Sequence, residues 1–267
     1  MRILFLGDIV GRSGRDAVIQ KMPQLKEKYA PDVTIVNAEN AAGGFGINAE
    51  IAKSLFAIGV DCLTTGNHIW DQKDAMSYIS QEKRLLRPMN FPPGTPGFGS
   101  YLLETSKGKK VLVVNLMARL FMDPVDCPFQ SIQNLLMRYS LGSSVDAIFI
   151  DFHGETSSEK MSFGHFVDGK VSAVVGTHTH IPTSDLRILE KRTAYQTDAG
   201  MCGDYNSVIG MEKTTPVQKF VTKMPGPKMT PAMGEATLCG SIIDLDDDGL
   251  AVSVQQLILG PHLAERG

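Results

Sequence analysis

The sequence predicts an α/β fold in which buried strands alternate with helices. Short apolar runs recur along the chain, and each of them ends in polar residues or glycine. Stretches with apolar residues at helical spacing lie between several of these runs. The 267 residues suffice for one large domain with at most a small appended lobe. This rhythm is typical of α/β architecture.

The predicted strands begin at the N-terminus, where the apolar run is too short for a signal peptide or a membrane span. In chain order they cover residues 3–6, 33–37, 61–65, 111–116, 147–151, 173–176, 240–245 and 251–257. The last two flank Asp246-Asp247-Asp248-Gly249, a turn sequence that predicts a β-hairpin.

Helical spacing of apolar residues predicts helices over residues 14–29, 49–58, 72–80 and 128–139. Residues 87–99 contain four prolines and three glycines, so we expect a surface loop there. Residues 201–235 are rich in Gly, Pro, Met and Lys and have weak periodicity. We expect this segment to form a small cap within a single domain that spans residues 1–267.

Composition excludes several classes of function. The formal net charge is −3, so no global basic field attracts nucleic acid or an anionic membrane surface. The four cysteines are far apart and form no CxxC pair, which argues against a zinc knuckle or a dithiol redox motif. These features favour a cytoplasmic protein without a membrane partner and without strong nucleic-acid binding.

Polar side chains follow the predicted strands at the points where the strands end. They are Asp8, Glu39 with Asn40, Asn67 with His68, His153, and His178 with His180. In sheet-based α/β folds, ligands bind beyond the carboxyl ends of the strands, because residues there project from a rigid scaffold into open loops. We therefore expect these distant positions to converge.

The chemistry of this set predicts a two-metal phosphoesterase. Carboxylates, amide oxygens and imidazoles without thiolates suit iron, manganese, zinc or cobalt better than calcium. Two adjacent dications repel each other, so they need a bridging anion, and Glu39 is the natural bridge. Such metals produce a hydroxide at neutral pH that attacks phosphorus, and no covalent intermediate is required.

Some residues of this set have an alternative interpretation. In a simple strand, His178 and His180 would point to opposite sides, whereas in a turn after Gly176 both can face one site. His153 alone is consistent with a hydrogen-bonded core histidine, and Asp8 alone with a turn or cap residue. Their shared position after strands favours metal binding. The glycine-rich residues 41–46 either bring backbone amides near a phosphate or form a flexible turn.

The order of these motifs resembles that of the calcineurin-like metallophosphoesterase superfamily. The motifs are Gly7-Asp8, Gly66-Asn67-His68, an isolated His153, and Gly176-Thr177-His178-Thr179-His180. The superfamily usually has a histidine where this chain has Val10, and an aspartate as bridge where it has Glu39. Both departures agree with the YmdB-like family of bacterial metallophosphoesterases.

The chain resembles the YmdB-like family over essentially its whole length. The matching motifs are Gly7-Asp8-Ile9-Val10-Gly11-Arg12, Asn37-Ala38-Glu39-Asn40, Gly66-Asn67-His68-Ile69-Trp70-Asp71 and Gly203-Asp204-Tyr205-Asn206-Ser207-Val208-Ile209-Gly210. The resemblance implies a four-layer αββα sandwich, in which two central sheets are flanked by helices and carry a small cap. It also implies a phosphodiesterase for cyclic nucleotides, above all 2′,3′-cyclic nucleotides opened at the 2′ side, with cyclic AMP as a further candidate.

The resemblance further implies a division of the ligands. One metal is held by Asp8, Glu39, Asn40 and His180, and the other by Glu39, Asn67, His153 and His178. Iron is the metal that the resemblance favours, although the ligand set also admits manganese or zinc. Asn40 either coordinates or only orients a neighbouring residue.

His68 directly follows an expected ligand, so its ring can stand beside the metals and protonate the leaving oxygen as a general acid. A structural or phosphate-orienting role is the alternative. The same centre would also serve a phosphomonoesterase or a nuclease. A regulatory protein with structural metals is the candidate from another class. The small diester substrate is the expected partner, and assembly into a homo-oligomer stays open.

Overall fold

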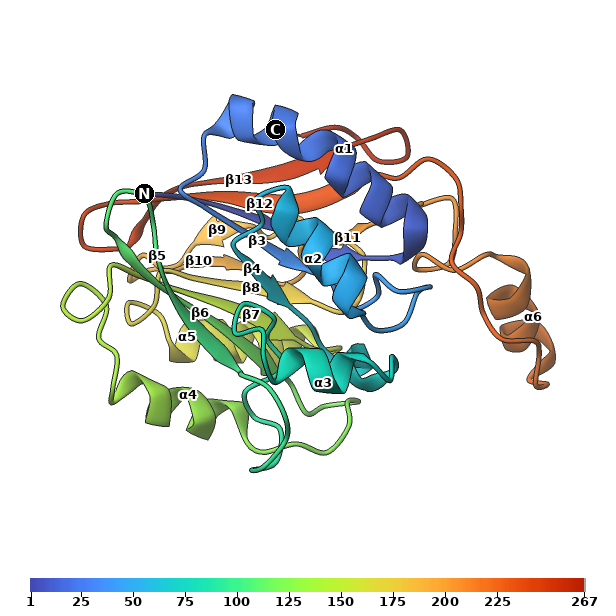
Figure 1. The fold of residues 1–267 in the computed structure, drawn as a ribbon, viewed down its shortest axis with the longest axis horizontal. Helices are drawn as coiled ribbons and strands as arrows, with labels where there is room; N and C mark the ends of the chain where they lie inside the picture. The colour runs from blue at the N-terminus through green and yellow to red at the C-terminus, as the bar shows by residue number, and fades with distance from the viewer. Residues whose placement is uncertain (267) are drawn as a thin grey trace.

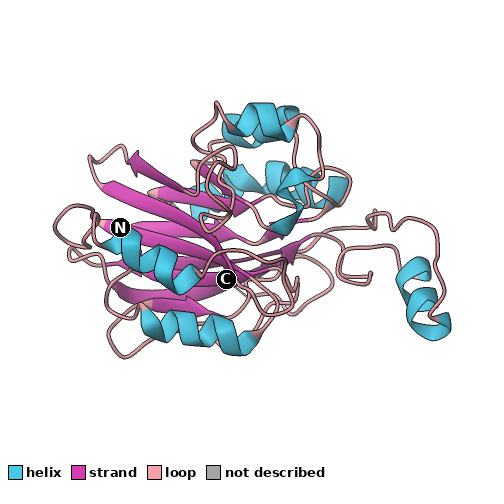
Figure 2. Ribbon diagram, turned by 90° about the horizontal axis from the view of Figure 1, so that it is seen from below, coloured by secondary structure: helices cyan, strands magenta, loops and turns pink. Residues whose placement is uncertain are grey.

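Two β-sheets pack face to face at the centre of the molecule, and helices cover their outer faces (Figures 1 and 2). The computed structural model describes residues 1–266. The first sheet has the order β13 (Ala251–Leu259), β12 (Leu238–Leu245), β1 (Arg2–Leu6), β3 (Val33–Asn37) and β4 (Cys62–Thr64). The second has the order β5 (Ser100–Glu104), β6 (Lys110–Met117), β7 (Ala147–His153), β8 (Ala173–Thr177), β10 (Ala194–Gln196) and β9 (Arg187–Ile188).

The strands that carry the polar motifs run parallel to one another within each sheet. In the first sheet β1 pairs with β3, with Leu6 opposite Val36, and β3 pairs with β4. In the second sheet β7 pairs with β8, with His153 opposite Thr177. Parallel strands end at the same edge of a sheet, so the residues that follow them gather there. The predicted hairpin is also present, because β12 pairs antiparallel with β13.

The space between the sheets is an apolar core to which both sheets contribute. Phe5 of β1 and Phe149 of β7 have ring centroids 5.0 Å apart. Ile35 and Val113 are buried in the same core. Every residue of β3 and of β7 is buried, because one face of each strand packs on the other sheet and the opposite face packs on helices. This double burial explains why both strands are continuous apolar runs in the sequence.

Helices complete the outer layers. On the first sheet, α1 (Gly11–Tyr29) and α2 (Ala49–Ala57) bury residues such as Val18 and Leu55 against Leu4 and Leu6. On the second sheet lie α4 (Pro128–Leu136) and α5 (Ser157–Phe166). Phe163 of α5 stacks on Phe152 of β7 with ring centroids 4.1 Å apart. The predicted four-layer αββα sandwich is confirmed.

Several elements differ from the sequence prediction. The helix expected over residues 72–80 is present but shorter, as α3 (Ala75–Ile79), and an unpredicted 3₁₀ helix, η1 (Asn67–Trp70), precedes it. The spacing of apolar residues did not predict α5, which contains Gly164, a residue of low helix propensity. An added Cβ at Gly164 would collide with the ring of Tyr195, so this glycine allows the helix to approach the sheet. The sequence also gave no indication of β5, β9 and β10 of the second sheet.

Residues 87–99 form no helix or strand, in agreement with the predicted loop.

The predicted cap segment begins in the body of the protein, because β11 (Met201–Cys202) pairs with β2 (Asp8–Ile9) in a small separate sheet. Farther along, α6 (Thr214–Thr222) projects sideways from the two sheets (Figures 1 and 2). Among the helices of residues 1–266, none is long and apolar enough to cross a bilayer.

Candidate metal centre

His153, the last residue of β7, presents one ring nitrogen to the sheet edge with its lone pair free. Its Nδ1 lies 2.9 Å from the hydroxyl of Thr177, and that hydroxyl donates to Asp151 over 2.6 Å. A hydroxyl has one proton to give, so it accepts from the Nδ1–H of His153. The lone pair of the ring is therefore on Nε2. This is how proteins orient an imidazole for a metal.

The other two histidines are oriented in the same manner. His178 Nε2 lies 3.2 Å from the carboxylate of Glu155, whose negative charge favours the proton on this nitrogen. His180 Nδ1 donates to the backbone carbonyl of Ile209 over 2.7 Å. These contacts leave the lone pair on Nδ1 of His178 and on Nε2 of His180. The three imidazoles thus enter the site as acceptors.

The atoms that meet at His153 repel one another unless a cation lies among them. His153 Nε2 is 3.1 Å from His178 Nδ1, 3.1 Å from Asn67 Oδ1 and 3.2 Å from Glu39 Oε2. All four atoms carry lone pairs in the arrangement above. A bound dication would turn this repulsion into attraction, so the cluster fits a metal ion.

A second cluster lies beside the first and shares Glu39 with it. It consists of Asp8, Glu39 and His180, whereas the first consists of Glu39, His153 and His178. In each cluster the candidate ligand atoms lie within 4.8 Å of one another. Asp8 Oδ1 is buried and has no hydrogen-bond partner within residues 1–266. An orphaned buried carboxylate oxygen is costly, and a metal ion would satisfy it.

Asn40 lies at the second cluster with its amide nitrogen facing inward. This nitrogen is 3.0 Å from Glu39 Oε1 and 3.1 Å from His180 Nε2, while Asn40 Oδ1 is buried without a partner among residues 1–266. The two ends of a side-chain amide are assigned from their hydrogen-bond partners. Turning the amide would place its oxygen toward the cluster, where it could act as a ligand. As oriented, Asn40 is an orienting residue for Glu39.

Burial strongly perturbs the charges of this site. It raises the pKa of Asp8 to about 7, and Asp198 adds to this effect. Burial, followed by the charge of Asp8, raises the pKa of Glu39 well above its ordinary value. Burial also lowers the pKa of His178 to about 4 and that of His153 well below its ordinary value. Neutral imidazoles are the form that binds metals, and a cation would favour the ionised carboxylates.

The turn that carries His178 and His180 has an unusual backbone. Both histidines have positive φ, 102° and 67°, which L residues rarely adopt. These angles turn both rings toward the site, which a continued strand could not do. The turn is held by Asp198, whose carboxylate accepts from the backbone N–H of Thr179 over 3.0 Å. The fully buried Lys160 lies 2.8 Å from the Asp198 carboxylate and supplies its counter-charge in the interior.

Gly66, immediately before Asn67, allows the site to close. A Cβ at this position would collide with Glu39 Oε2 and His153 Nε2. Position 66 therefore has to be glycine for the loop after β4 to approach the other candidate ligands. Two polar residues in and after β6 lie near this edge but contact other groups. Asn115 Oδ1 accepts from the backbone N–H of Thr65 over 3.1 Å, and Arg119 lines a separate pocket.

His68 lies beside the clusters without belonging to either of them. Its Nδ1 is 2.8 Å from Asp71 Oδ2, and 31% of its side chain is exposed. The sequence did not single out Asp71 as the partner of His68, or Glu155 as the partner of His178. The position of Asp71 three residues after His68, within one helical turn, is a signal that would have found it.

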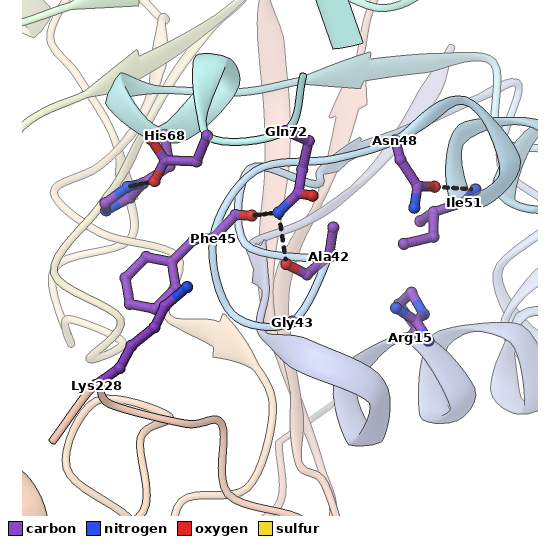
Figure 3. A pocket seen from close by; sticks show the side chains of 10 residues that line it. Arg15, Ala42, Gly43, Phe45, Asn48, Ile51, His68, Gln72 and Lys228 are labelled. Carbon is purple, nitrogen blue, oxygen red and sulfur yellow. Dashed lines mark hydrogen bonds and ion pairs between the residues drawn. The ribbon is translucent and has the colours of Figure 1, made fainter. Parts of the chain in front are cut away.

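A pocket of about 700 Å³ opens next to His68 (Figure 3). It is lined by Arg15, Ala42, Gly43, Phe45, Asn48, Ile51, His68, Asp71, Gln72 and Lys228. The Phe45 ring meets the His68 ring edge-on with centroids 5.2 Å apart. Gln72 donates to the carbonyls of Ala42 and Phe45, so the glycine-rich loop is held in place rather than left flexible.

With this geometry established, comparison with known proteins identifies the family. The family model of YmdB-like proteins matches residues 4–257. The chain belongs to the YmdB-like family. The membership predicted from the motifs is thereby confirmed. A curated relative, the 2′,3′-cyclic-nucleotide 2′-phosphodiesterase of Bacillus subtilis (strain 168), is 46% identical over 260 residues, which cover 97% of each chain. This relative is a phosphoric diester hydrolase, the enzyme class that the sequence predicted.

Solved structures of similar proteins support the YmdB-like fold. A hypothetical protein from Thermus thermophilus superposes with a TM-score of 0.91 at 39% identity, covering 97% of this chain and 99% of the other. A novel phosphatase from Mycoplasma pneumoniae superposes with a TM-score of 0.90 at 33% identity, covering 97% of this chain and 93% of the other. The fold is therefore that of metallophosphoesterase-type proteins.

Proposed function

We propose that the chain is a cytoplasmic, metal-dependent phosphodiesterase that hydrolyses small cyclic nucleotides, with 2′,3′-cyclic nucleotides as the first candidates and 3′,5′-cyclic AMP as a second. One observation carries the proposal: two ligand clusters share the buried carboxylate of Glu39. A shared carboxylate is what two adjacent dications require, and such pairs serve phosphoryl-transfer enzymes. The 46% identical relative from Bacillus subtilis, a 2′,3′-cyclic-nucleotide 2′-phosphodiesterase, supports the substrate class.

The proposed ligands follow the two clusters. Asp8, Glu39 and His180 would hold one metal, with Asn40 as a further ligand after rotation of its amide. Glu39, His153 and His178 would hold the other, together with Asn67 Oδ1, which lies 3.1 Å from His153 Nε2. The mixture of nitrogen and oxygen donors suits iron, which we propose as the native metal, and also admits manganese or zinc.

The bound metals would supply a nucleophile by lowering the pKa of water and would offset the charge that develops on phosphorus. The protein's own contribution is to place groups around that charge. His68 lies at the rim, next to Asn67, where it can give a proton to the departing ribose oxygen. Asp71 accepts from its Nδ1–H, so the proton for the leaving group would be the second proton of the imidazolium form, on Nε2.

Metal analysis combined with turnover assays tests this function. We expect the purified protein to contain two metal ions per chain and to open 2′,3′-cyclic nucleotides faster than 3′,5′-cyclic AMP. A phosphomonoester and a short RNA serve as competing substrates. Faster turnover of either would favour a phosphomonoesterase or a nuclease. Full metal occupancy with no turnover on any of these substrates would favour a regulatory protein instead.

A further inference from the structure

The pocket beside His68 is built from the segments that carry the proposed metal ligands. The residues after Asp8 lead into α1, which contributes Arg15 to the pocket. The residues after Asn40 form the loop of Gly43 and Phe45, and the residues after Asn67 contribute His68 and Gln72. A substrate whose reacting phosphate is at the metals would therefore extend into this pocket. Its volume of about 700 Å³ is within the range of small-ligand sites.

The pocket has an excess of positive charge. Arg15 and Lys228 line it, and neither has a carboxylate within ion-pair distance among residues 1–266. Arg15 donates to the carbonyl of Ala41 over 2.7 Å, which leaves its other N–H groups available. The one acidic side chain in the lining, Asp71, is held by His68. A partly buried arginine without an anion favours an anionic ligand.

The pocket also offers a surface for a ring. Phe45 is half-buried and stands between His68 and Lys228, whose Nζ lies 5.8 Å from the centre of the phenyl ring (Figure 3). Aromatic faces of this kind stack on nucleobases and sugars irrespective of sequence. Lys228 belongs to the segment that sequence analysis interpreted as a cap, so this segment contributes a charged group beside the proposed acid.

We propose that this pocket binds the nucleoside part of the substrate and that the positive charge of Arg15 and Lys228, which line opposite sides of the pocket, attracts a second phosphate on the 5′ side of that nucleoside (Figure 3). The proposal rests on the function proposed above and specifies its substrate class. The preferred substrate would be a nucleoside 2′,3′-cyclic phosphate that carries a further phosphate, either as a free 5′-phosphate or as the link to a preceding nucleotide. A second phosphate would give the partly buried Arg15 an anionic partner, which an uncharged nucleoside would not.

Steady-state kinetics on matched probes tests the proposal. The probes are adenosine 2′,3′-cyclic phosphate, the same molecule with a 5′-phosphate, and a dinucleotide that ends in a 2′,3′-cyclic phosphate. We expect kcat/KM to be at least about tenfold higher for the two probes with a second phosphate, since charge-assisted hydrogen bonds have strengths of this order. A preference for only one of them distinguishes a terminal 5′-phosphate from an internucleotide phosphate.

Variants show whether the pocket causes the preference. In Lys228→Ala and Arg15→Gln the ratio of kcat/KM between phosphorylated and unphosphorylated probes should fall toward one. Lys219→Ala, an exposed lysine of α6 outside the pocket, should keep the ratio of the unmodified protein. Equal kcat/KM for all probes, or a ratio that both pocket variants leave unchanged, overturns the proposal.

A binding measurement distinguishes failure of this proposal from failure of the proposed function. If the metal-loaded protein hydrolyses no probe, the proposed function fails. Calorimetry with adenosine 5′-monophosphate then tests by itself whether the pocket binds a phosphate. Weaker binding to Lys228→Ala than to Lys219→Ala supports a phosphate site. Equal binding to both variants contradicts it.

Discussion

The carboxylate of Asp71 lies 2.8 Å from Nδ1 of His68, one helical turn along the chain. The pair is at the rim of the proposed metal centre, where His68 lines the adjacent pocket. This contact orients the imidazole and determines which ring nitrogen faces the pocket. Asp71 can therefore position the proposed acid, although Asp71 belongs to neither ligand cluster.

Replacing His68 should impair chemistry and leave the metals in place. For His68→Ala we expect kcat toward 2′,3′-cyclic nucleotides to fall by about 10²–10⁴-fold, the effect typical of a lost general acid. Elemental analysis should still find two metals. A nitrophenyl phosphodiester, whose leaving group needs no proton, should lose much less. Unchanged turnover on the cyclic nucleotide would show that His68 is not the acid.

Replacing Asp71 tests the orientation of that acid. Asp71→Asn removes a charged acceptor of Nδ1–H, so kcat should fall by about tenfold or more while KM and metal content stay constant. The nearby exposed Asp74 provides a control, and Asp74→Asn should keep full activity. Equal activity of the two variants would exclude a positioning role for Asp71.

Glu39→Gln tests the shared carboxylate. Neutralising a bridge between two cations leaves their repulsion uncompensated, so we expect metal content to fall below two ions per chain and turnover to be lost. Glu50→Gln, the matched change at an exposed position, should retain both ions. Full dinuclear occupancy in Glu39→Gln would contradict the bridge.

Gly66→Ala tests the close approach at the centre. The new Cβ would collide with Glu39 Oε2 and His153 Nε2, so the variant should bind metal poorly even though it adds only one methyl group. Gly94 has φ of +88° and open space around it. Gly94→Ala should cost about 1 kcal/mol of folding free energy through backbone strain and should keep both metals. Normal metal binding by Gly66→Ala would show that the loop has room to move.

The buried pair of Lys160 and Asp198 should matter for stability. Lys160→Met leaves the Asp198 carboxylate buried without its counter-ion, so the free energy of unfolding should fall by about 3–5 kcal/mol. The half-exposed pair of Lys109 and Asp146 is the control, and Lys109→Met should cost at most about 1 kcal/mol. Denaturant unfolding measures both. Equal losses would mean that the buried pair is no more important than the surface pair.

The sequence by itself determined where the strands lie and which residues end them. Strands such as β3 and β7 are buried on both faces, so they are unbroken apolar runs whose ends are visible without coordinates. Asp8 and His153 follow such runs, and parallel strands bring their ends to one edge. For this reason the candidate ligands and the α/β class were predictable from local pattern, whereas the four-layer sandwich was implied by the family resemblance.

Only the tertiary structure decided how these residues act together. The family resemblance implied two sets of candidate ligands that share Glu39, but whether their atoms lie close together depends on distances between strands of different sheets. The burial of Lys160 and the approach of Lys228 to Phe45 had no local signal, because each depends on a segment remote in sequence. Hydrophobic periodicity shows which side of a segment faces the core. A site is made by side chains from several segments, and their contacts exist only once the sheets have packed.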